Sequence, residues 1–369
     1  MDERKEPSWT RRHVITAAAG LALMPEIAIK SANAESRKVT VPSEAEPHAR
    51  TWMAWPSTPA VYGGPGAYYE SVQETLGRLA AAIAENEPVT MAAAAEHHAL
   101  AAELCGPEVE LIDIATDDMW MRDSGPVFVR TSGGTIAAVD FRFNGWGNKQ
   151  AHAHDAEIAS SVAKSVGADR RVFSIRGEGG GIEYDGHGTL LLTESCWVND
   201  NRNPGLGRAE IEQHLKKTLG VEVVVWVPGV RGKDITDGHI DGSIRFVKPG
   251  LLVASSWPGD TSEWGRAHEE ALAILAKAKD ARGRAFEVIS IPSATNARST
   301  SEDFLTSYAN YYVGNGALYT PQFGDRKADA FARETLGRLH PERRIVQLDM
   351  DRIYENGGGI HCVTQQQPR

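Results

Sequence analysis

Cys362 lies in a segment whose composition suits nucleophilic chemistry. Gly357, Gly358 and Gly359 precede it and carry no side chains, so backbone and substrate can approach the sulfur closely. The thiolate of a cysteine is a strong nucleophile where local charge and access favour it. On these residues alone, a catalytic nucleophile and a buried cysteine that packs as a small hydrophobic side chain are equally good interpretations.

His239 and Asp241 add an imidazole paired with a carboxylate. They are two residues apart between Gly238 and Gly242, so on an extended strand both side chains point to the same face. Imidazole titrates near neutrality, and a neighbouring carboxylate can stabilise its protonated form or hold a cation. We therefore predict that His239 acts as a general acid and base and that Cys362 is the nucleophile.

A zinc site is the alternative use of the same segment. Asp237, His239 and Asp241 could together ligate the metal. However, the sequence has no HExxH motif, no CxxC pair and no second closely spaced histidine pair with carboxylates. We therefore expect no metal ion in the site.

Two more acidic residues stand in unusual surroundings. Asp123 follows Trp120 by three residues, and a carboxylate beside a large aromatic ring suits a planar cation, which it can bind in a bidentate manner while the cation stacks on the ring. A capped turn next to a core tryptophan is the plainer alternative. Glu178 opens a run of three glycines that matches neither a dinucleotide fingerprint nor a phosphate-binding loop.

Composition excludes several classes of protein. The chain has 369 residues and a net charge of −10, which argues against an electrostatic nucleic-acid binder. No apolar run approaches the roughly 20 residues that a bilayer requires, so we expect no membrane partner for the mature protein. The three cysteines, an odd number, leave at least one free thiol and exclude a fully disulfide-paired scaffold.

The first 34 residues have the pattern of an export signal. Arg11 and Arg12 precede a short apolar stretch, and the small-residue sequence Ala32-Asn33-Ala34 follows it. We therefore expect residues 1–34 to be a twin-arginine signal, the mature protein to be periplasmic or otherwise extracytoplasmic, and residues 35–369 to form one catalytic domain. A disordered N-terminal arm is the alternative.

Strand and helix patterns alternate along the rest of the chain. Apolar residues at helical spacing predict helices near 69–87, 153–166, 208–219, 262–279 and 326–339. Short β-branched and aromatic runs predict strands that include 109–114, 127–130, 135–143, 171–175, 221–227, 243–247, 286–291 and 344–348. This alternation indicates an α/β protein, and a cyclic arrangement of five strand–helix units would make it a single domain.

The polar residues recur with the same spacing as the helices. Successive intervals of 55, 61, 71 and 52 residues separate Asp123, Glu178, His239, Asn310 and Cys362. Each of the five units would then contribute one residue to a shared centre. Units that converge on an axis can build a pocket from residues that are far apart in the sequence.

In these segments the chain resembles the agmatine deiminase family, which includes the bacterial peptidylarginine deiminases and belongs to the pentein superfold. The resemblance covers about residues 47–367 and depends on WMRDSGP (120–126), FNGWGNK (143–149), TDGHIDG (236–242) and GGIHCVTQQ (358–366). It implies a five-fold pseudosymmetric αβ-propeller that uses neither a metal nor an organic cofactor.

The resemblance also implies a role for each catalytic residue. Cys362 would attack the guanidinium carbon and form a covalent amidino-thioether. Asp123 and Asp241 would bind the guanidinium nitrogens, and Glu178 would face the guanidinium and orient His239. His239 would protonate the departing ammonia and then activate the water that releases a ureido product.

Substrate binding is expected to involve two further residues, Trp120 and Asn310. Two departures from the family pattern stand out: Gly359 replaces an asparagine, and Gly145 and Gly147 replace arginines with which the peptidylarginine branch grips a substrate carboxylate. Their absence favours a small cationic guanidino substrate without a carboxylate, namely agmatine, hydrolysed to N-carbamoylputrescine and ammonia.

Other functions remain open on the sequence. They are deimination of peptidyl or free arginine to citrulline, amidino transfer to an amine, and guanidine binding by an exported protein without catalysis. The sequence also leaves the oligomeric state open, a homo-oligomer included.

Overall fold

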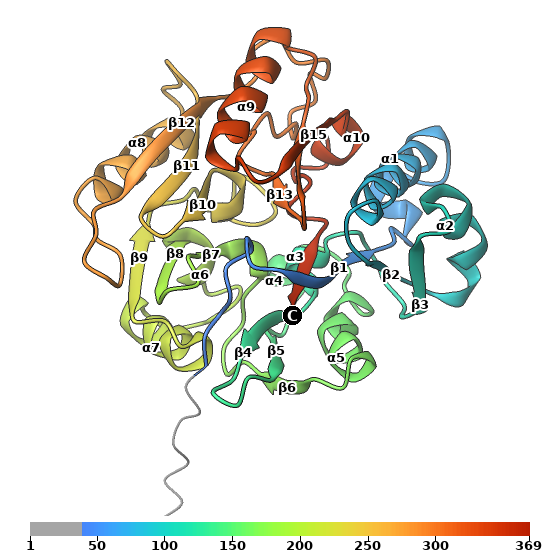
Figure 1. Ribbon diagram of the computed structural model, residues 1–369, viewed down its shortest axis with the longest axis horizontal. Helices are drawn as coiled ribbons and strands as arrows, with labels where there is room; N and C mark the ends of the chain where they lie inside the picture. The colour runs from blue at the N-terminus through green and yellow to red at the C-terminus, as the bar shows by residue number, and fades with distance from the viewer. Residues whose placement is uncertain (1–38) are drawn as a thin grey trace, which may run out of the picture. The chain divides into compact units, whose positions relative to one another are not determined.

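Five small sheets, each accompanied by a helix, make up the structure (Figure 1). The computed structural model describes residues 39–369, and these belong to one compact unit. Each sheet repeats one order of elements: two antiparallel strands, a helix, and a strand that returns parallel to the second strand. The predicted five-fold αβ-propeller is therefore confirmed.

The five modules have the following main elements. The first contains β16 (Gln365–Pro368), β1 (His48–Ala54), α1 (Ala67–Ala84), β2 (Val89–Ala93), α2 (His98–Cys105) and β3 (Val109–Asp113). The second contains β4 (Val127–Arg130), β5 (Ile136–Asp140), α5 (Asp155–Ser165) and β6 (Asp169–Val172). The third contains β7 (Ile182–Tyr184), β8 (Thr189–Thr193), α7 (Arg208–Leu219) and β9 (Val223–Val227). The fourth contains β10 (Ile244–Lys248), β11 (Leu251–Ser256), α8 (Glu263–Leu275) and β12 (Glu287–Pro292). The fifth contains β13 (Tyr312–Val313), β14 (Ala317–Pro321), α9 (Arg326–Leu339) and β15 (Arg344–Leu348).

The main helices lie on the outside of the ring of sheets and bury one face each (Figure 1). In α1 the residues at three- and four-residue spacing, Val72, Leu76, Leu79 and Ile83, are all fully buried. This buried face accounts for the helical spacing that predicted a helix near 69–87, and the helix ends at Ala84, before Pro88, a residue that could not continue it. All five predicted helices are present.

The predicted strands are present with small shifts at their ends. The largest concerns the run at 171–175, because β6 spans Asp169–Val172, with one further backbone hydrogen bond from Phe173 to Asp140 of β5. Phe173 and Ile175 are buried beyond the end of the strand, so their hydrophobic character reflects core packing rather than strand pairing.

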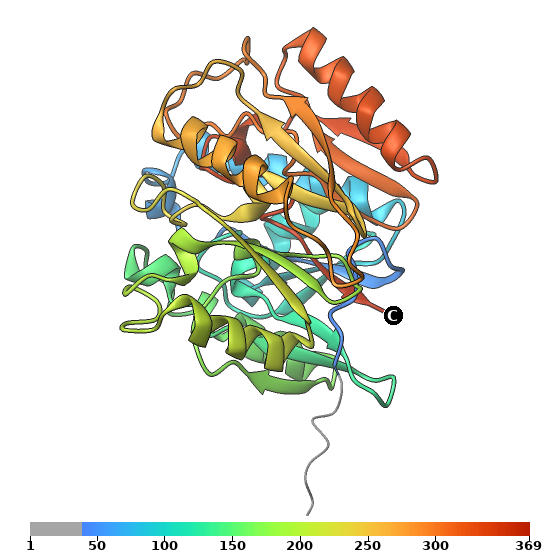
Figure 2. The same ribbon diagram turned by 90° about the vertical axis from the view of Figure 1, so that its left-hand side faces the viewer.

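The ends of the described chain meet in the first sheet. β16, drawn in red, pairs antiparallel with β1, drawn in blue, and this pairing joins the last module to the first (Figures 1 and 2). The expected export signal at residues 1–34 lies outside the described residues. Within residues 39–369, no helix is both long and apolar enough to cross a membrane.

Candidate active site

The five residues that recur along the sequence each lie directly before the first strand of a module. Asp123 precedes β4, Glu178 precedes β7, His239 precedes β10, Asn310 precedes β13 and Cys362 precedes β16. The equivalent position in each module faces the centre of the ring, so segments that are distant in sequence meet there. The convergence predicted from the spacing is present.

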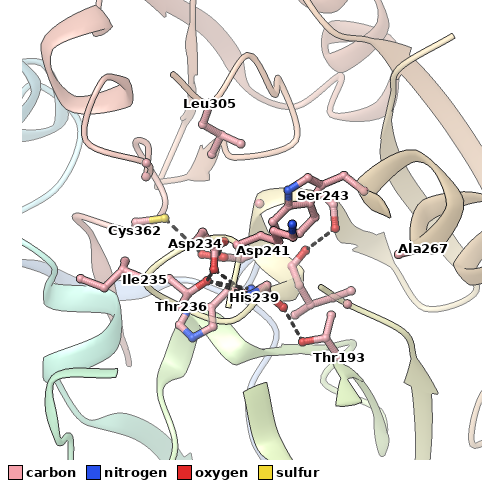
Figure 3. A pocket seen from close by; sticks show the side chains of 18 of the residues that line it. Thr193, Asp234, Ile235, Thr236, His239, Asp241, Ser243, Ala267, Leu305 and Cys362 are labelled. Carbon is pink, nitrogen blue, oxygen red and sulfur yellow. Dashed lines mark hydrogen bonds between the residues drawn. The ribbon is translucent and has the colours of Figure 1, made fainter. Parts of the chain in front are cut away.

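A cavity of about 330 Å³ opens at this centre. Asp123, His239, Asp241 and Cys362 line it together with Trp120. The sulfur of Cys362 is directed toward Asp241, with His239 nearby, while Ala267 of α8 lies across the pocket (Figure 3). The arrangement places a thiol, an imidazole and two carboxylates in one partly enclosed space.

Cys362 is the only one of the three cysteines that is not fully buried. Its sulfur lies 3.5 Å from Oδ2 of Asp241 and accepts a hydrogen bond from Nδ2 of Asn310 at 3.2 Å. Burial, reinforced by the negative charges of Asp241 and Asp123, raises the pKa of the Cys362 thiol well above its usual value. The sulfur is therefore protonated near neutral pH in the pocket without a ligand.

The two carboxylates differ in their surroundings. Oδ1 of Asp123 accepts a hydrogen bond from the backbone N–H of Gly180, and Oδ2 accepts one from Nε1 of Trp146, both at 2.9 Å. Burial and the nearby carboxylates raise the pKa of Asp123, whereas the hydrogen bond and positive charge of His361 outweigh burial and lower the pKa of Asp241. A cationic ligand between them would stabilise both in the ionised form.

His239 lies between two carboxylates. Nδ1 is 3.6 Å from Oδ1 of Asp123, and Nε2 is 3.4 Å from Oε2 of Glu178. Burial disfavours the imidazolium, but the charges of Asp123 and Glu178 outweigh it and raise the pKa of His239 to about 9. His239 is therefore protonated at neutral pH and can donate a proton.

The expected extended strand at His239 and Asp241 is wrong. His239 has extended backbone angles, but Ile240–Gly242 form a short 3-10 turn and β10 begins only at Ile244. The left-handed backbone of Asp237 and Gly238, with φ of 62° and 85°, turns the chain into this segment. Both side chains still reach the pocket, because the turn rather than a strand presents them.

Glu178 lies behind His239 and is not part of the pocket wall. Nε of Arg202 donates to both of its oxygens, at 2.8 and 3.0 Å, and Nη1 of Arg202 donates to Asp237 at 2.7 Å. Glu178 is thus held by Arg202 on one side and contacts His239 on the other. This geometry fits the expected orienting role but not direct contact with a guanidinium.

Asp237, the third candidate zinc ligand, is already paired with cations. Oδ2 accepts from Arg202 and also lies 2.7 Å from Nζ of Lys149. Burial raises the pKa of Asp237, but hydrogen bonds from Lys149, Asn201 and Arg202 outweigh it and lower it to about 2. Among residues 39–369, no group of three or more His, Cys, Asp and Glu side chains is arranged to hold a metal ion.

The two residues expected to bind substrate occupy different places. Trp120 lines the pocket, and its Nε1 donates to Asp118 at 2.9 Å. Asn310 is fully buried and outside the pocket wall, where its Oδ1 accepts from the backbone N–H of His361 and its Nδ2 donates to Cys362. The structure therefore places Asn310 behind the nucleophile and not against the substrate.

Sequence reasoning missed several residues that shape the site. Trp146 hydrogen-bonds Asp123, Arg202 holds Glu178, and the ring of His361 lies against Asp241. Trp146 and Arg202 lie in short motifs rich in glycine and asparagine. Their polar surroundings mark a loop but do not indicate which carboxylate each side chain meets.

Gly145 and Gly147, which stand where the peptidylarginine branch has arginines, are not among the residues that line the pocket. Both have left-handed backbones, with φ of 62° and 86°. A side chain at Gly145 would collide with Gln150 and His152, and one at Gly147 would collide with Asn201. Arg142 and Lys149, the nearby cations, are not among the residues that line the pocket.

Residues 40–368 match the family described as Porphyromonas-type peptidyl-arginine deiminase. The chain belongs to this family. Deimination of a guanidino group is hydrolysis of one of its C–N bonds, so the family places the chain among hydrolases that act on such bonds.

Relatives in bacteria match nearly the whole chain. A protein of Streptomyces coelicolor is 40% identical over 342 residues, which span 89% of this chain and 98% of that protein. The agmatine deiminase of Stutzerimonas stutzeri is 36% identical over 354 residues, which span 89% of this chain and 95% of the relative. The solved agmatine deiminase of Enterococcus faecalis has a TM-score of 0.83 and 29% identity over 90% of this chain and 96% of its own. These matches also confirm the fold.

Proposed function

We propose that this protein hydrolyses the guanidino group of agmatine, giving N-carbamoylputrescine and ammonia. The observation that carries the proposal is that Cys362, His239, Asp123 and Asp241 all line one pocket. A guanidinium resists nucleophilic attack because resonance stabilises it. Carboxylates that fix it and an acid that protonates its leaving group supply what the reaction needs. The named relatives from Stutzerimonas stutzeri and Enterococcus faecalis support the choice of agmatine.

In the first half of the reaction, we place the guanidinium between Asp123 and Asp241, next to the sulfur. Its positive charge offsets the two carboxylates that raise the pKa of the Cys362 thiol, so the thiolate forms more easily once substrate is bound, and the thiol proton passes to solvent. The sulfur attacks the guanidinium carbon, and the C–N bond to one terminal nitrogen breaks. His239 gives that nitrogen a proton, and ammonia leaves an amidino-thioether on Cys362.

In the second half, the now neutral His239 takes a proton from water. The hydroxide adds to the same carbon, and the C–S bond breaks with the sulfur leaving as thiolate. The added hydroxyl then gives its proton to the sulfur, which restores the thiol and releases the neutral ureido product, while the ammonia of the first half takes up the proton that had passed to solvent. Overall, one guanidinium and one water give one urea and one ammonium ion, so no additional oxidant or proton donor is required. Glu178 keeps Nε2 of His239 oriented through both steps.

The distal part of the pocket is consistent with a cationic tail. Among the described residues that line the cavity, Lys233 is the only lysine or arginine, whereas Asp234, Asp260, Glu302 and Asp303 contribute carboxylates. Lys233 is half exposed and lies 3.6 Å from Glu263. An ammonium group suits these surroundings. A substrate carboxylate would enter an acidic site where its one cationic partner, Lys233, is already partly neutralised by Glu263.

Ammonia release from agmatine, free arginine and a peptide with a C-terminal arginine tests the assignment. We expect kcat/KM for agmatine to exceed that for arginine by on the order of a hundredfold, since each 1.4 kcal/mol of discrimination is about tenfold. Comparable values, or preference for the peptide, would overturn agmatine as substrate. Binding without ammonia release from all three would identify a guanidine-binding protein instead.

We further propose that residues 1–34 direct export through the twin-arginine pathway. Arg11 and Arg12 ahead of a short apolar stretch support this. In a bacterial host with this pathway, the wild-type chain should reach the periplasm in shortened form, and a chain with Lys at both positions should remain in the cytoplasm. Equal distribution of the two chains would contradict the proposal.

A further inference from the structure

His361, the residue immediately before the nucleophile, does not line the pocket. It lies between two carboxylates, one of which belongs to the pocket wall. Nδ1 is 2.7 Å from Oδ2 of Asp241, and Nε2 is 2.8 Å from Oε2 of Glu44. The imidazole is only 2% exposed, and Glu44 comes from the segment that precedes β1. The ring therefore links the N-terminal segment to a carboxylate of the active site.

Both ring nitrogens of His361 must donate hydrogen bonds in this arrangement. Ionised carboxylates accept hydrogen bonds and cannot donate them, so a neutral imidazole could satisfy only one of the two partners. An imidazolium satisfies both, and charge-assisted bonds of this length are strong.

The charges around His361 support the same protonation state. The connected buried groups are three carboxylates and two guanidiniums, namely Glu44, Glu183, Asp241, Arg122 and Arg245. Without a proton on both nitrogens of His361, this cluster would hold one unbalanced negative charge. An uncompensated buried charge is strongly destabilising, and an imidazolium at His361 balances it.

The cluster connects to the chemistry through a single oxygen. Oδ2 of Asp241 accepts from His361 and is also the atom 3.5 Å from the sulfur of Cys362. The orientation of the Asp241 carboxylate, and the negative charge that the sulfur experiences from it, both depend on His361. Asn310 orients the same loop from the other side, through the backbone N–H of His361 and the sulfur.

We propose that His361 is a positioning residue: an imidazolium that joins Glu44 to Asp241, holds Asp241 toward the substrate and offsets its charge beside Cys362. This role rests on the proposed function only in that Asp241 is the guanidinium ligand and Cys362 the nucleophile. It gives the N-terminal segment a part in the active site, because Glu44 holds the second proton of His361.

The rate of Cys362 alkylation at a fixed pH tests this role without substrate, and the KM for agmatine adds a second measurement. In His361→Gln, the rate of modification by iodoacetamide at pH 8.5 should fall at least about tenfold, because an uncompensated Asp241 suppresses thiolate formation. Glu44→Gln, which removes the partner of the second proton, should shift the rate in the same direction by a smaller factor. The KM for agmatine should rise in both variants.

Two controls isolate the effect. His340→Gln removes another buried histidine that does not contact the pocket, and Glu46→Gln changes a half-exposed carboxylate of the same N-terminal segment. Both should keep the wild-type alkylation rate. Folded His361→Gln or Glu44→Gln with wild-type alkylation and wild-type KM would overturn the proposal. Because alkylation requires no substrate, failure to hydrolyse agmatine would leave this result interpretable.

Discussion

At the scale of single residues, the site is a set of charges whose states depend on one another. His239 is protonated because Asp123 and Glu178 flank it, and Cys362 is protonated because carboxylates and burial surround it. The free enzyme therefore holds a neutral thiol beside an imidazolium. A cationic substrate changes this balance, so binding and activation of the nucleophile are coupled, and neutral molecules gain no such activation.

The protonation of His239 should be visible in stability. The pKa of His239 rises from about 6.5 in the unfolded chain to about 9 in the folded one. The stability that protonated His239 adds to the fold is therefore fully present below pH 6.5 and is lost as the pH rises through 9. The shift corresponds to on the order of 3 kcal/mol. Urea denaturation measures the free energy of unfolding at pH 6.5 and at pH 9.5. Between these two pH values, that free energy should fall more for the wild type than for His239→Asn. Equal losses would mean that His239 is not charged in the folded state.

At the scale of elements, each module brings one side chain to the centre from the segment before its first strand. The third module does this with Gly179–Gly181, a short 3-10 turn after Glu178. Gly180 lies among the catalytic groups: a methyl there would be 2.7 Å from Oδ1 of Asp123 and 2.7 Å from Nδ1 of His239. The glycine run is therefore required by close approach of backbone to the site.

Gly180→Ala should therefore impair catalysis with little change in fold. The methyl must displace Asp123 or His239, and a displacement of about 1 Å can cost on the order of a hundredfold in rate. Steady-state kcat/KM for agmatine, with circular dichroism for folding, measures this. Gly133→Ala is the matched control, because its methyl would meet only Thr131 at 3.7 Å. Wild-type kcat/KM in Gly180→Ala would contradict the described packing.

The elements also show why part of the fold could be predicted from the sequence. The outer helices alternate between buried and exposed faces, so residues such as Val72 and Leu76 mark them by their spacing. The central strands β8 and β14 are buried along their whole length and have no such alternation, and they were not among the predicted strands.

The active site, like the fold, could be predicted only in part from the sequence. Cys362, His239 and Asp241 could be predicted because glycines isolate reactive side chains at recognisable spacing. The pairing of Trp146 with Asp123 could not, since it depends on a left-handed turn that folds one loop of the second module onto another. Contacts between loops that are distant in the sequence follow from the three-dimensional arrangement and have no local signal.

At the scale of the whole molecule, the ring is closed by pairing between the two ends of the described chain. β1 and β16 share a sheet, and Cys362 lies just before β16. The segment before β1 also reaches the centre, where Glu44 contacts Arg122, Arg245 and His361. The N-terminal segment is therefore part of the catalytic unit, although it precedes the first strand.

Two shortened chains should behave differently for this reason. A chain that starts at residue 35 should keep the urea midpoint and activity of the full chain, because residues 1–34 are expected to be a removable signal. A chain that starts at residue 47 lacks Glu44. Its free energy of unfolding should be lower by about 3 kcal/mol or more, the usual effect of breaking a buried ion pair. Equal stability of the two chains would show that Glu44 does not hold the centre.

Ammonia release from agmatine by the wild type and by Cys362→Ser, purified side by side, tests whether Cys362 is the covalent nucleophile. The wild type should release ammonia and the folded Ser variant none above background, because the hydroxyl cannot replace the thiolate as nucleophile. Cys196→Ala should retain activity, since Cys196 is buried outside the pocket. Substantial ammonia release by folded Cys362→Ser would contradict covalent catalysis at this residue.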